Sequence, residues 1–350
     1  MAVTIMDVAR ESGVHRSTVS RALNNQPDVS PAVRAKVLEV ARKLNYRPSA
    51  AARVMGGCLN ETIGLVTEIE SGIGPYGPAL IEGISMSLSE RGVRLATNVI
   101  HWGGTTDDVR RLPLFKTDAI DGVILDVHKS EGNIEAVVRE YGVPFVFVNP
   151  ARGKDLNAVV PDDVSVARQA TVYLAERGHK AIGYVPCFKT EHISQANRVK
   201  GYMEAMESSG LKPLPVFTVP VVEKREQGLS GIFLPGMEAK KELVAYLRQY
   251  SCRGFVVYSA PEANWLYSVL LTLGYRIPED ISIISCDYDP ILSYMETPVT
   301  SFFLDRIQMG RTAVEMLQKR IESKGEEEPA IMVEGVLKEG LSVAERPGTA

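Results

Sequence analysis

The sequence is short of cysteine and contains no long apolar segment. Its four cysteines, Cys58, Cys187, Cys252 and Cys286, are scattered and form no C-x-x-C pair, which argues against a disulfide framework and a cysteine metal site. No apolar run approaches the roughly 20 residues that a transmembrane helix needs. The N-terminal stretch MAVTIMDVARES has charges and no apolar core, unlike a secretory signal. We therefore expect a protein of the reducing cytoplasm without a membrane span.

Patterns typical of an active site are also scarce. No Ser-His-Asp or paired-carboxylate arrangement is visible, so we expect no catalytic residues, no metal ion and no cofactor. One pattern does suggest an enzyme: G-x-G-x-x-G at residues 72–77 would suit a dinucleotide-binding dehydrogenase. Pro75 lies inside this motif, and the next predicted strand ends at Asn98 with no acid placed for a ribose. Both features argue against an enzyme of this class.

What the chain does contain is a charge asymmetry. Its 350 residues have a net charge of −4, with 45% hydrophobic and 23% charged residues, as in an ordinary globular protein. Residues 1–57 hold nine Lys and Arg against four Asp and Glu, a net charge of +5, so the remainder carries −9. A basic head on an acidic body suggests that the head contacts a polyanion and the body does not.

Residues 1–48 predict a small helix-turn-helix domain. Thr4 and Asp7 fit a capping box, and the apolar residues that follow have helical spacing as far as Gly13, which suits a turn. A second amphipathic stretch follows, and Ser30 with Pro31 is typical of the start of a third helix. Two short helices joined by a turn that contains glycine describe a helix-turn-helix.

The outward face of the second predicted helix carries polar side chains that no core requires. They are His15, Arg16, Ser17, Thr18, Ser20 and Arg21. Arginine can donate two hydrogen bonds to guanine, and serine and threonine hydroxyls reach bases or phosphates. We therefore predict that this face contacts DNA. A three-helix bundle with a merely polar surface is the alternative, and the charge of the head argues against it.

The head resembles a known family. Residues 3–55 contain D-V-A, G-V, T-V-S-R, V-S, R-V and L-N-Y-x-P in the order and spacing of the lactose/galactose-repressor (LacI/GalR) family of transcription regulators. The resemblance implies that Arg16, Ser17 and Arg21 read bases. It also implies phosphate contacts by a second set, which comprises Thr4, Thr18, Ser20, Asn24, Ser30 and Tyr46.

Residues 49–60 are the predicted hinge helix and linker. Ser49 begins a short alanine-rich helix that includes Ala52 and is too short to be stable alone. In the resembling family such helices enter the minor groove as a dimeric pair. Met55 stands where the family usually has a leucine wedge, and methionine can also wedge between base steps.

Residues 61–350 alternate short apolar runs with amphipathic stretches, which predicts an α/β domain of two lobes with parallel sheets. The predicted strands are IGLVTEI, VRLATNV, DGVILD and PFVFV in the first half, and NAVVP, AIGYVP, LPVFTV, GFVVYS and ISIISC in the second half. The predicted helices span 77–91, 163–178, 195–209, 237–249 and 262–273. This region resembles the periplasmic-binding-protein-like domain of the same family. The resemblance implies an N-lobe of 61–160 plus 290–323 and a C-lobe of 161–289 plus 324–345.

An effector site is expected between the lobes, because ligands in such sheets bind outside the carboxyl ends of the strands. Positions that match the family's effector contacts are Tyr76, Ser194, Arg198 and Asp287. Arg198 is the strongest candidate, since a fixed guanidinium can fork to hydroxyls, a carboxylate or a phosphate. Strand-end placement adds Asp126, Asn149, Asp162 and His192. The effector stays open between a sugar, a sugar phosphate, a nucleobase and another metabolite.

Together these features predict a repressor of transcription in the bacterial nucleoid. The resemblance implies a homodimer that binds a palindromic operator in double-stranded DNA, with an affinity that a small-molecule effector controls. Inducer and corepressor roles both stay open, as do dimer and tetramer. The rival with the same body, a solute-binding protein of a transport system, would need a secretory signal and would have no use for a basic head.

Overall fold

The computed structural model describes most of the chain as two compact units. The described residues are 4–23, 28–44, 61–69, 77–101, 103–115, 120–188, 192–217, 221–226, 229–235 and 237–346. The smaller unit, here called the head, comprises Met1–Thr62 with Ala119–Asp121. The larger unit, the body, comprises Ile63–Asp118 with Gly122–Ala350.

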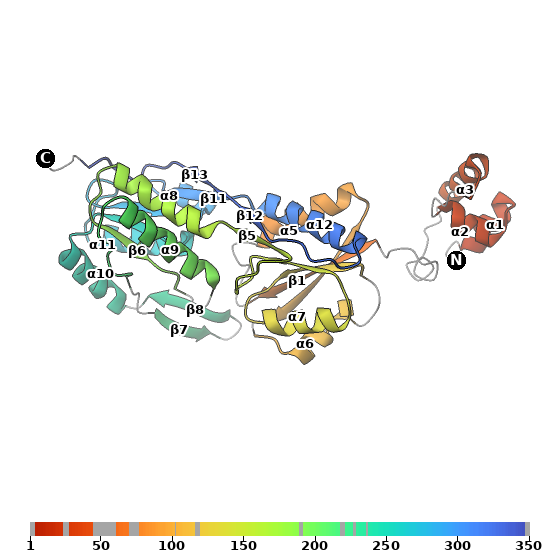
Figure 1. The fold of residues 1–350 in the computed structure, drawn as a ribbon, viewed down its shortest axis with the longest axis horizontal. Helices are drawn as coiled ribbons and strands as arrows, with labels where there is room; N and C mark the ends of the chain where they lie inside the picture. Colours follow the sequence, from red (N-terminus) through yellow and green to blue (C-terminus); the bar gives the residue numbers. More distant parts are fainter. Residues whose placement is uncertain are drawn as a thin grey trace. The chain divides into compact units, whose positions relative to one another are not determined.

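Three helices lie in the described part of the head (Figure 1): α1 (Ile5–Ser12), α2 (Arg16–Leu23) and α3 (Pro31–Lys43). The predicted capping box is confirmed, because the Asp7 carboxylate accepts from the backbone N–H and the hydroxyl of Thr4, at 2.9 and 2.7 Å. Gly13 follows α1 with a φ of +67°, a conformation that favours glycine. Apolar side chains from these helices and from the turn between α2 and α3 fill the core. They are Val8, Ala9, Val19, Ala22, Val29, Val37 and Ala41.

The first lobe of the body is a sheet between two pairs of helices. Its strands lie in the order β12 (Ile331–Val333), β5 (Ala158–Pro161), β4 (Phe145–Val148), β3 (Gly122–Asp126), β1 (Thr62–Ile69) and β2 (Arg94–His101). Helices α5 (Gly77–Glu90) and α12 (Arg306–Glu322) cover one face, and α6 (Thr106–Arg110) and α7 (Glu131–Glu140) lie on the other (Figure 1). A short 3-10 turn, η1, spans Pro113–Phe115. The pairings from β1 through β3, β4 and β5 to β12 are parallel.

The second lobe repeats this plan. Its strands lie in the order β13 (Gly335–Lys338), β11 (Thr300–Leu304), β10 (Ser282–Ser285), β9 (Gly254–Val257) and β6 (Ile182–Val185). All pairings are parallel except that of β13 with β11. Helices α8 (Asp163–Glu176) and α9 (Ile193–Ser208) pack on one face, and α10 (Met237–Tyr250) and α11 (Ala260–Thr272) on the other. A 3-10 turn, η2 (Pro290–Ser293), and a hairpin of β7 (Val221–Glu226) and β8 (Leu229–Pro235) complete the lobe.

Three connections join the lobes, and each is one residue long between regular elements. Asp162 connects β5 to α8, Asp305 connects β11 to α12, and Glu334 connects β12 to β13. Each aspartate caps the helix that it precedes, because its carboxylate accepts from the N–H three residues ahead, at 3.0 and 2.8 Å. The N–H of Asp162 also donates to the carbonyl oxygen of Val333 at 2.9 Å, which ties the first connection to the third.

The predicted lobe boundaries were wrong in two places. Strand β11 belongs to the second sheet and not to the N-lobe, because Ile284 and Ser285 of β10 pair with its first residues. Strand β12 belongs to the first sheet and not to the C-lobe, because it pairs with Val159 and its neighbours in β5. Strands of three to five residues give no sequence signal for the sheet that they join.

Most predicted strands and helices are confirmed within a few residues. Two predictions failed. NAVVP was assigned to the second half, but β5 lies in the first sheet. The described part of LPVFTV, residues 214–217, is irregular, and only the N–H of Phe217 bonds to strand β6, at the carbonyl oxygen of Tyr184. Among the described helices, none is both long and apolar enough to span a bilayer.

Candidate functional site

Helix α2 presents its polar residues away from the head core. Arg16, Ser17 and Arg21 are exposed, while Thr18 and Ser20 are partly buried at the edges of the same face. His15 caps the helix, because its Nδ1 accepts from the backbone N–H of Ser17 at 3.3 Å and lies 2.9 Å from that residue's hydroxyl. The predicted base-reading side chains therefore share one exposed face.

Arg21 lies beside an acid that the sequence analysis did not single out. Its Nη1 donates to Asp28 Oδ2 at 2.7 Å, and its Nε donates to the carbonyl oxygen of Ser17 at 3.4 Å. The side chains of Arg21 and Asp28 are 49% and 52% exposed, so solvent reaches both partners of this ion pair.

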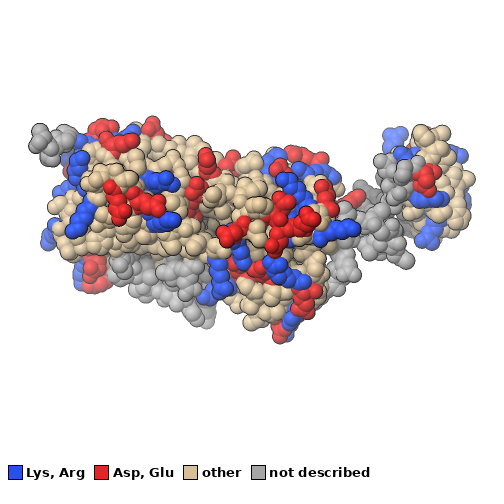
Figure 2. All heavy atoms as spheres, viewed as in Figure 1, with Lys and Arg blue, Asp and Glu red and all other residues tan. Residues whose placement is uncertain are grey.

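Two predicted phosphate contacts have structural duties at helix starts. Thr4 precedes α1 and donates its hydroxyl to Asp7, while Ser30 precedes α3 and its hydroxyl accepts from the N–H of Val33 at 3.4 Å. Both stay exposed. The remaining predicted contacts, Asn24, Tyr46, Ser49, Ala52 and Met55, lie outside the described residues. Figure 2 shows Lys and Arg around the visible face of the head and little acidic surface there.

At the carboxyl edge of the first sheet, polar groups gather at the ends of β1 and β3 and directly after β4. Asp126 ends β3, and Thr67 donates its hydroxyl to Asp126 Oδ2 at 3.1 Å. Burial raises the pKa of Asp126 to about 6, against the hydrogen bond from Thr67 and with help from the charge of Glu68. Asn149 follows β4 with a φ of +47°, so a left-handed turn begins there.

The start of α9 meets this edge from the second lobe. His192 caps α9 by accepting from the N–H of Ser194 at 3.1 Å, and its Nε2 lies 3.1 Å from the carbonyl oxygen of Asn149. The N–H of Ile193 donates to the carbonyl oxygen of Ala151 at 2.7 Å. The structure therefore brings the predicted residues Asn149, His192 and Ser194 together.

Two histidine rings contact each other across the same junction, tilted by 55° between their planes. His128, in the loop after β3, lies 5.0 Å from His192 between ring centroids. Burial, with the neighbouring His192, lowers the pKa of His128 to about 4, and burial also lowers the pKa of His192. Both rings are therefore neutral near pH 7.

Arg198 lies deeper in the second lobe than the sequence predicts. Its Nε donates to Asp163 Oδ1 at 2.7 Å, its Nη1 donates to the carbonyl oxygen of Tyr258, and both charged side chains are at most 3% exposed. The guanidinium also lies 4.5 Å from the Tyr258 ring centroid. Arg198 thus links α9, α8 and the end of β9.

Asp287 has a separate partner. Nη2 of Arg306 donates to both of its carboxylate oxygens, at 2.7 and 2.6 Å, and both side chains are buried. Burial raises the pKa of Asp287, while the charge of Arg306 opposes that rise. Asp163 and Arg306 were not predicted from the sequence, although each begins a helix directly after a strand and a capping aspartate. Tyr76 lies outside the described residues.

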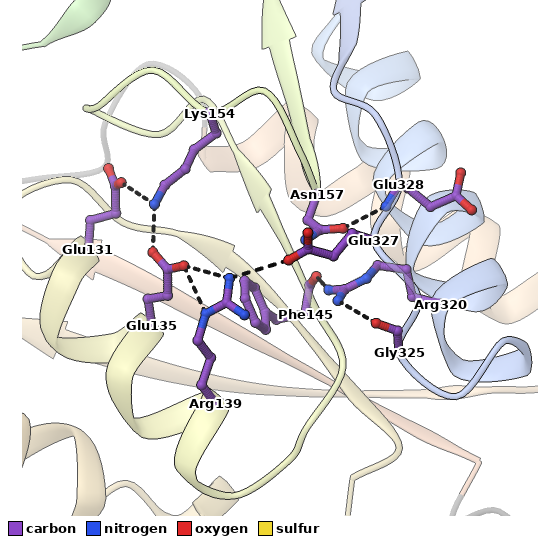
Figure 3. Close-up of polar contacts among 10 residues, drawn as sticks. All are labelled: Glu131, Glu135, Arg139, Phe145, Lys154, Asn157, Arg320, Gly325, Glu327 and Glu328. Carbon is purple, nitrogen blue, oxygen red and sulfur yellow. Dashed lines mark hydrogen bonds and ion pairs between the residues drawn. The ribbon is translucent and has the colours of Figure 1, made fainter.

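A hollow of about 250 Å³ lies elsewhere on the first lobe, beside α7 and β4. In Figure 3 the ammonium of Lys154 lies between carboxylates of Glu131 and Glu135, at 3.2 and 2.5 Å, and Arg139 lies between Glu135 and Glu327. The two cations beside the hollow, Lys154 and Arg139, are therefore both paired with neighbouring carboxylates.

Beside this hollow, Arg320 anchors the chain that leads to β12 (Figure 3). Its guanidinium donates to the carbonyl oxygens of Phe145, Gly325 and Glu326, and the N–H of Glu328 donates to Asn157 Oδ1 at 2.9 Å. We assign the ion pairs of Lys154 and Arg139 beside the hollow to the same anchoring role. Among the described residues, no group of three or more His, Cys, Asp or Glu side chains could hold a metal ion.

Family models match the head and the body separately. The model for "Bacterial regulatory proteins, lacI family" matches residues 4–49. The model for "Periplasmic binding proteins and sugar binding domain of LacI family" matches residues 60–230, and that for "Periplasmic binding protein-like domain" matches residues 171–343.

Relatives and solved structures match along nearly the whole chain. The HTH-type transcriptional regulator CelR of Thermobifida fusca is 27% identical over 340 residues, 95% of each chain. The HTH-type transcriptional repressor PurR of Proteus mirabilis (strain HI4320) is 27% identical over 349 residues, 98% of each chain. The lac repressor dimer bound to operator and the anti-inducer ONPF has a TM-score of 0.75 at 18% identity, covering 98% of this chain and 100% of that one. A CelR–cellobiose complex has a TM-score of 0.66 at 26% identity, covering 97% and 99%.

Fold and site define the class: a helix-turn-helix head joined to a two-lobed, periplasmic-binding-protein-like body. The model that matches the head describes bacterial regulatory proteins, and both relatives are named as regulators of transcription. The chain belongs to the LacI/GalR family and is a DNA-binding regulator of transcription.

Proposed function

We propose that this regulator is a homodimeric repressor that binds a palindromic operator in the bacterial nucleoid. Arg16, Ser17 and Arg21 read base edges in the major groove, and Thr4, Thr18, Ser20 and Ser30 contact phosphates. The predicted contacts of Asn24 and Tyr46, and of Ser49, Ala52 and Met55 in the minor groove, belong to the same proposal. It assigns the chain no reaction.

One observation carries the DNA-reading role. Helix α2 buries Val19 and Ala22 in the head core while its opposite face exposes two arginines and a serine on a head of net charge +5. A short helix with this exposed polar face is the shape and chemistry that the major groove accepts. The relatives named as transcriptional regulator and repressor support the direction of control.

The effector is proposed to bind where the strand ends of the two lobes meet. Asp126 and Asn149 from the first lobe, with Ser194, Arg198 and Asp287 from the second, are buried polar groups there, and His192 adds a half-buried ring. Tyr76 is a further predicted contact. Such a ligand would change operator affinity only if it binds one arrangement of the lobes better than the other. The cellobiose in the solved CelR complex makes a neutral saccharide the first class to test.

The test is a selection from sheared DNA of the protein's own genome. The intact protein should retain a short palindrome at near-physiological salt, and Arg16→Ala should lose about 1–3 kcal/mol for that site and much less for random DNA, where only one positive charge is removed. Equal losses on both DNAs would remove Arg16 from base reading. Sequence-blind retention, with and without metabolite pools, would refute the regulator proposal.

The effector site is tested by repeating the retention with cellobiose and other saccharides. A change in operator affinity that Ser194→Ala weakens would support the site. A change that no cleft substitution alters would place the effector elsewhere.

A further inference from the structure

We propose that Asp28 is a specificity-determining residue, which orients the guanidinium of Arg21 toward one base pair. The inference rests on the proposed DNA-reading role of α2 and goes beyond it, because Asp28 belongs to the turn between α2 and α3. It begins from the contact between Nη1 of Arg21 and Oδ2 of Asp28 at 2.7 Å.

The position of Asp28 is fixed by its neighbours. Val29 is 6% exposed in the head core, and Ser30 caps α3 through the N–H of Val33. The carboxylate therefore extends from a backbone that is held on its C-terminal side. Arg21 is held from the other side, because its Nε donates to the carbonyl oxygen of Ser17 one helical turn earlier.

These two contacts leave a useful set of donors. A guanidinium has five N–H donors in a rigid plane. The contacts with Ser17 and Asp28 use Nε and one hydrogen of Nη1. The remaining end, between Nη1 and Nη2, can donate in parallel to O6 and N7 of guanine. Asp28 thus fixes the plane of the fork while leaving its end available.

The negative charge of Asp28 affects DNA affinity and base preference in different ways. An acid on a DNA-facing surface is repelled by phosphates, so Asp28 lowers the affinity for all DNA. A half-exposed ion pair adds little to the stability of the head in water. Its benefit is therefore orientation, which favours the correct base pair over the wrong ones.

The experiment compares intact wild-type protein with Asp28→Asn, Asp28→Glu and Arg21→Ala. Each selects sites from a random DNA library and is then titrated against the selected site and all its single-base variants. Asp28→Asn should lower the discrimination at one base pair by about tenfold and raise the affinity for random DNA by about two- to fivefold. Asp28→Glu, which keeps the carboxylate, should retain part of the discrimination that Asp28→Asn loses.

Two controls separate orientation from simple charge removal. Glu39→Gln removes the same charge from an exposed position on α3, so it should raise affinity for random DNA without changing base preference. In an Arg21→Ala background, Asp28→Asn should no longer change discrimination, since the two residues act as a unit. Thermal unfolding should be unchanged in every variant, because these side chains are exposed.

The results that overturn the proposal are distinct. Unchanged base preference in Asp28→Asn would show that Asp28 acts only through charge. A loss at a base pair other than the one lost in Arg21→Ala would show that Asp28 contacts a base itself. Sequence-blind binding by the wild-type protein would overturn both this inference and the proposed function, whereas the first two results leave the proposed function intact.

Discussion

The imidazole of His192 donates its Nε2–H to the backbone carbonyl oxygen of Asn149, at 3.1 Å. The carbonyl can only accept, and Nδ1 of the same ring accepts from the N–H of Ser194, so the ring is neutral with its proton on Nε2. One side chain therefore caps a helix of the second lobe and bonds to the first.

Substitutions at His192 should separate these two contacts. His192→Ala should lower the free energy of unfolding by about 1–3 kcal/mol, because a helix cap and a hydrogen bond between the lobes are lost together. His192→Asn should recover part of this, since its short amide can cap α9 but is not long enough to bond Asn149. Urea denaturation measures both. Equal stability of His192→Ala and wild type would contradict the observed contacts.

The stability of the body should fall as the solution is acidified from pH 6.5. The pKa of His128 is about 4 in the folded state, chiefly because of burial, against about 6.5 when unfolded. Between these values the unfolded state binds more protons, so the free energy of unfolding falls with pH, by on the order of 2 kcal/mol by pH 5. His128→Gln should flatten this part of the profile. An unchanged slope would assign the dependence to other groups.

Asp126 should have the opposite effect. Its pKa is about 6 in the folded state and about 3.8 in the unfolded state, so the folded state binds more protons between these values. Its contribution to stability is complete below pH 3.8 and is lost as the pH rises to 6. Asp126→Asn should therefore make the unfolding profile steeper between pH 4 and 6. A flatter profile would show that Asp126 is ionised throughout that range.

Arg198→Met should destabilise the body by about 3–5 kcal/mol, because Asp163 would keep a buried charge without its partner. Adding Asp163→Asn should recover much of that loss. Guanidinium denaturation of the wild type, both single variants and the double variant gives the coupling energy. If Arg198→Met is as stable as wild type and only the response to effector is lost, Arg198 acts through the ligand alone.

The crossing of α8 and α9 depends on a residue with no side chain. A Cβ on Gly201 would lie 2.2 Å from the carbonyl oxygen of Val164, so Gly201→Ala should cost about 1–3 kcal/mol as the helices separate. Gly132→Ala is the matched control, since a Cβ there meets nothing within 4 Å and helix propensity favours alanine by about 0.5–1 kcal/mol. Thermal unfolding compares the two. Similar melting temperatures for both would show that the helices can move apart freely.

Much of the fold could be predicted from the sequence because its signals are local. Thr4 with Asp7 marked a helix start, and the runs that became β3 and β9 are short, apolar and bounded by polar residues. The lobe to which β11 and β12 belong could not be predicted, since it depends on pairing between residues far apart in the sequence.

The positions of the candidate site residues could be predicted from the sequence, but their ion-pair partners could not. Arg198 and Asp287 were expected to face a ligand, yet each is bound to a charged side chain that the sequence analysis did not name. Asp28 was counted only as a charge, because nothing in the local sequence shows that a turn brings it to Arg21. Long-range contacts of this kind are set by tertiary packing.

The single-residue connections at Asp162, Asp305 and Glu334 restrict how the lobes can move. So few backbone torsions between firmly packed elements allow the lobes to rotate about a common axis but hardly to slide or separate. Their relative motion then has essentially one degree of freedom, the angle about that axis. Chemically different ligands at the strand ends would all act on this one coordinate, and they would differ only in the angle that each one selects.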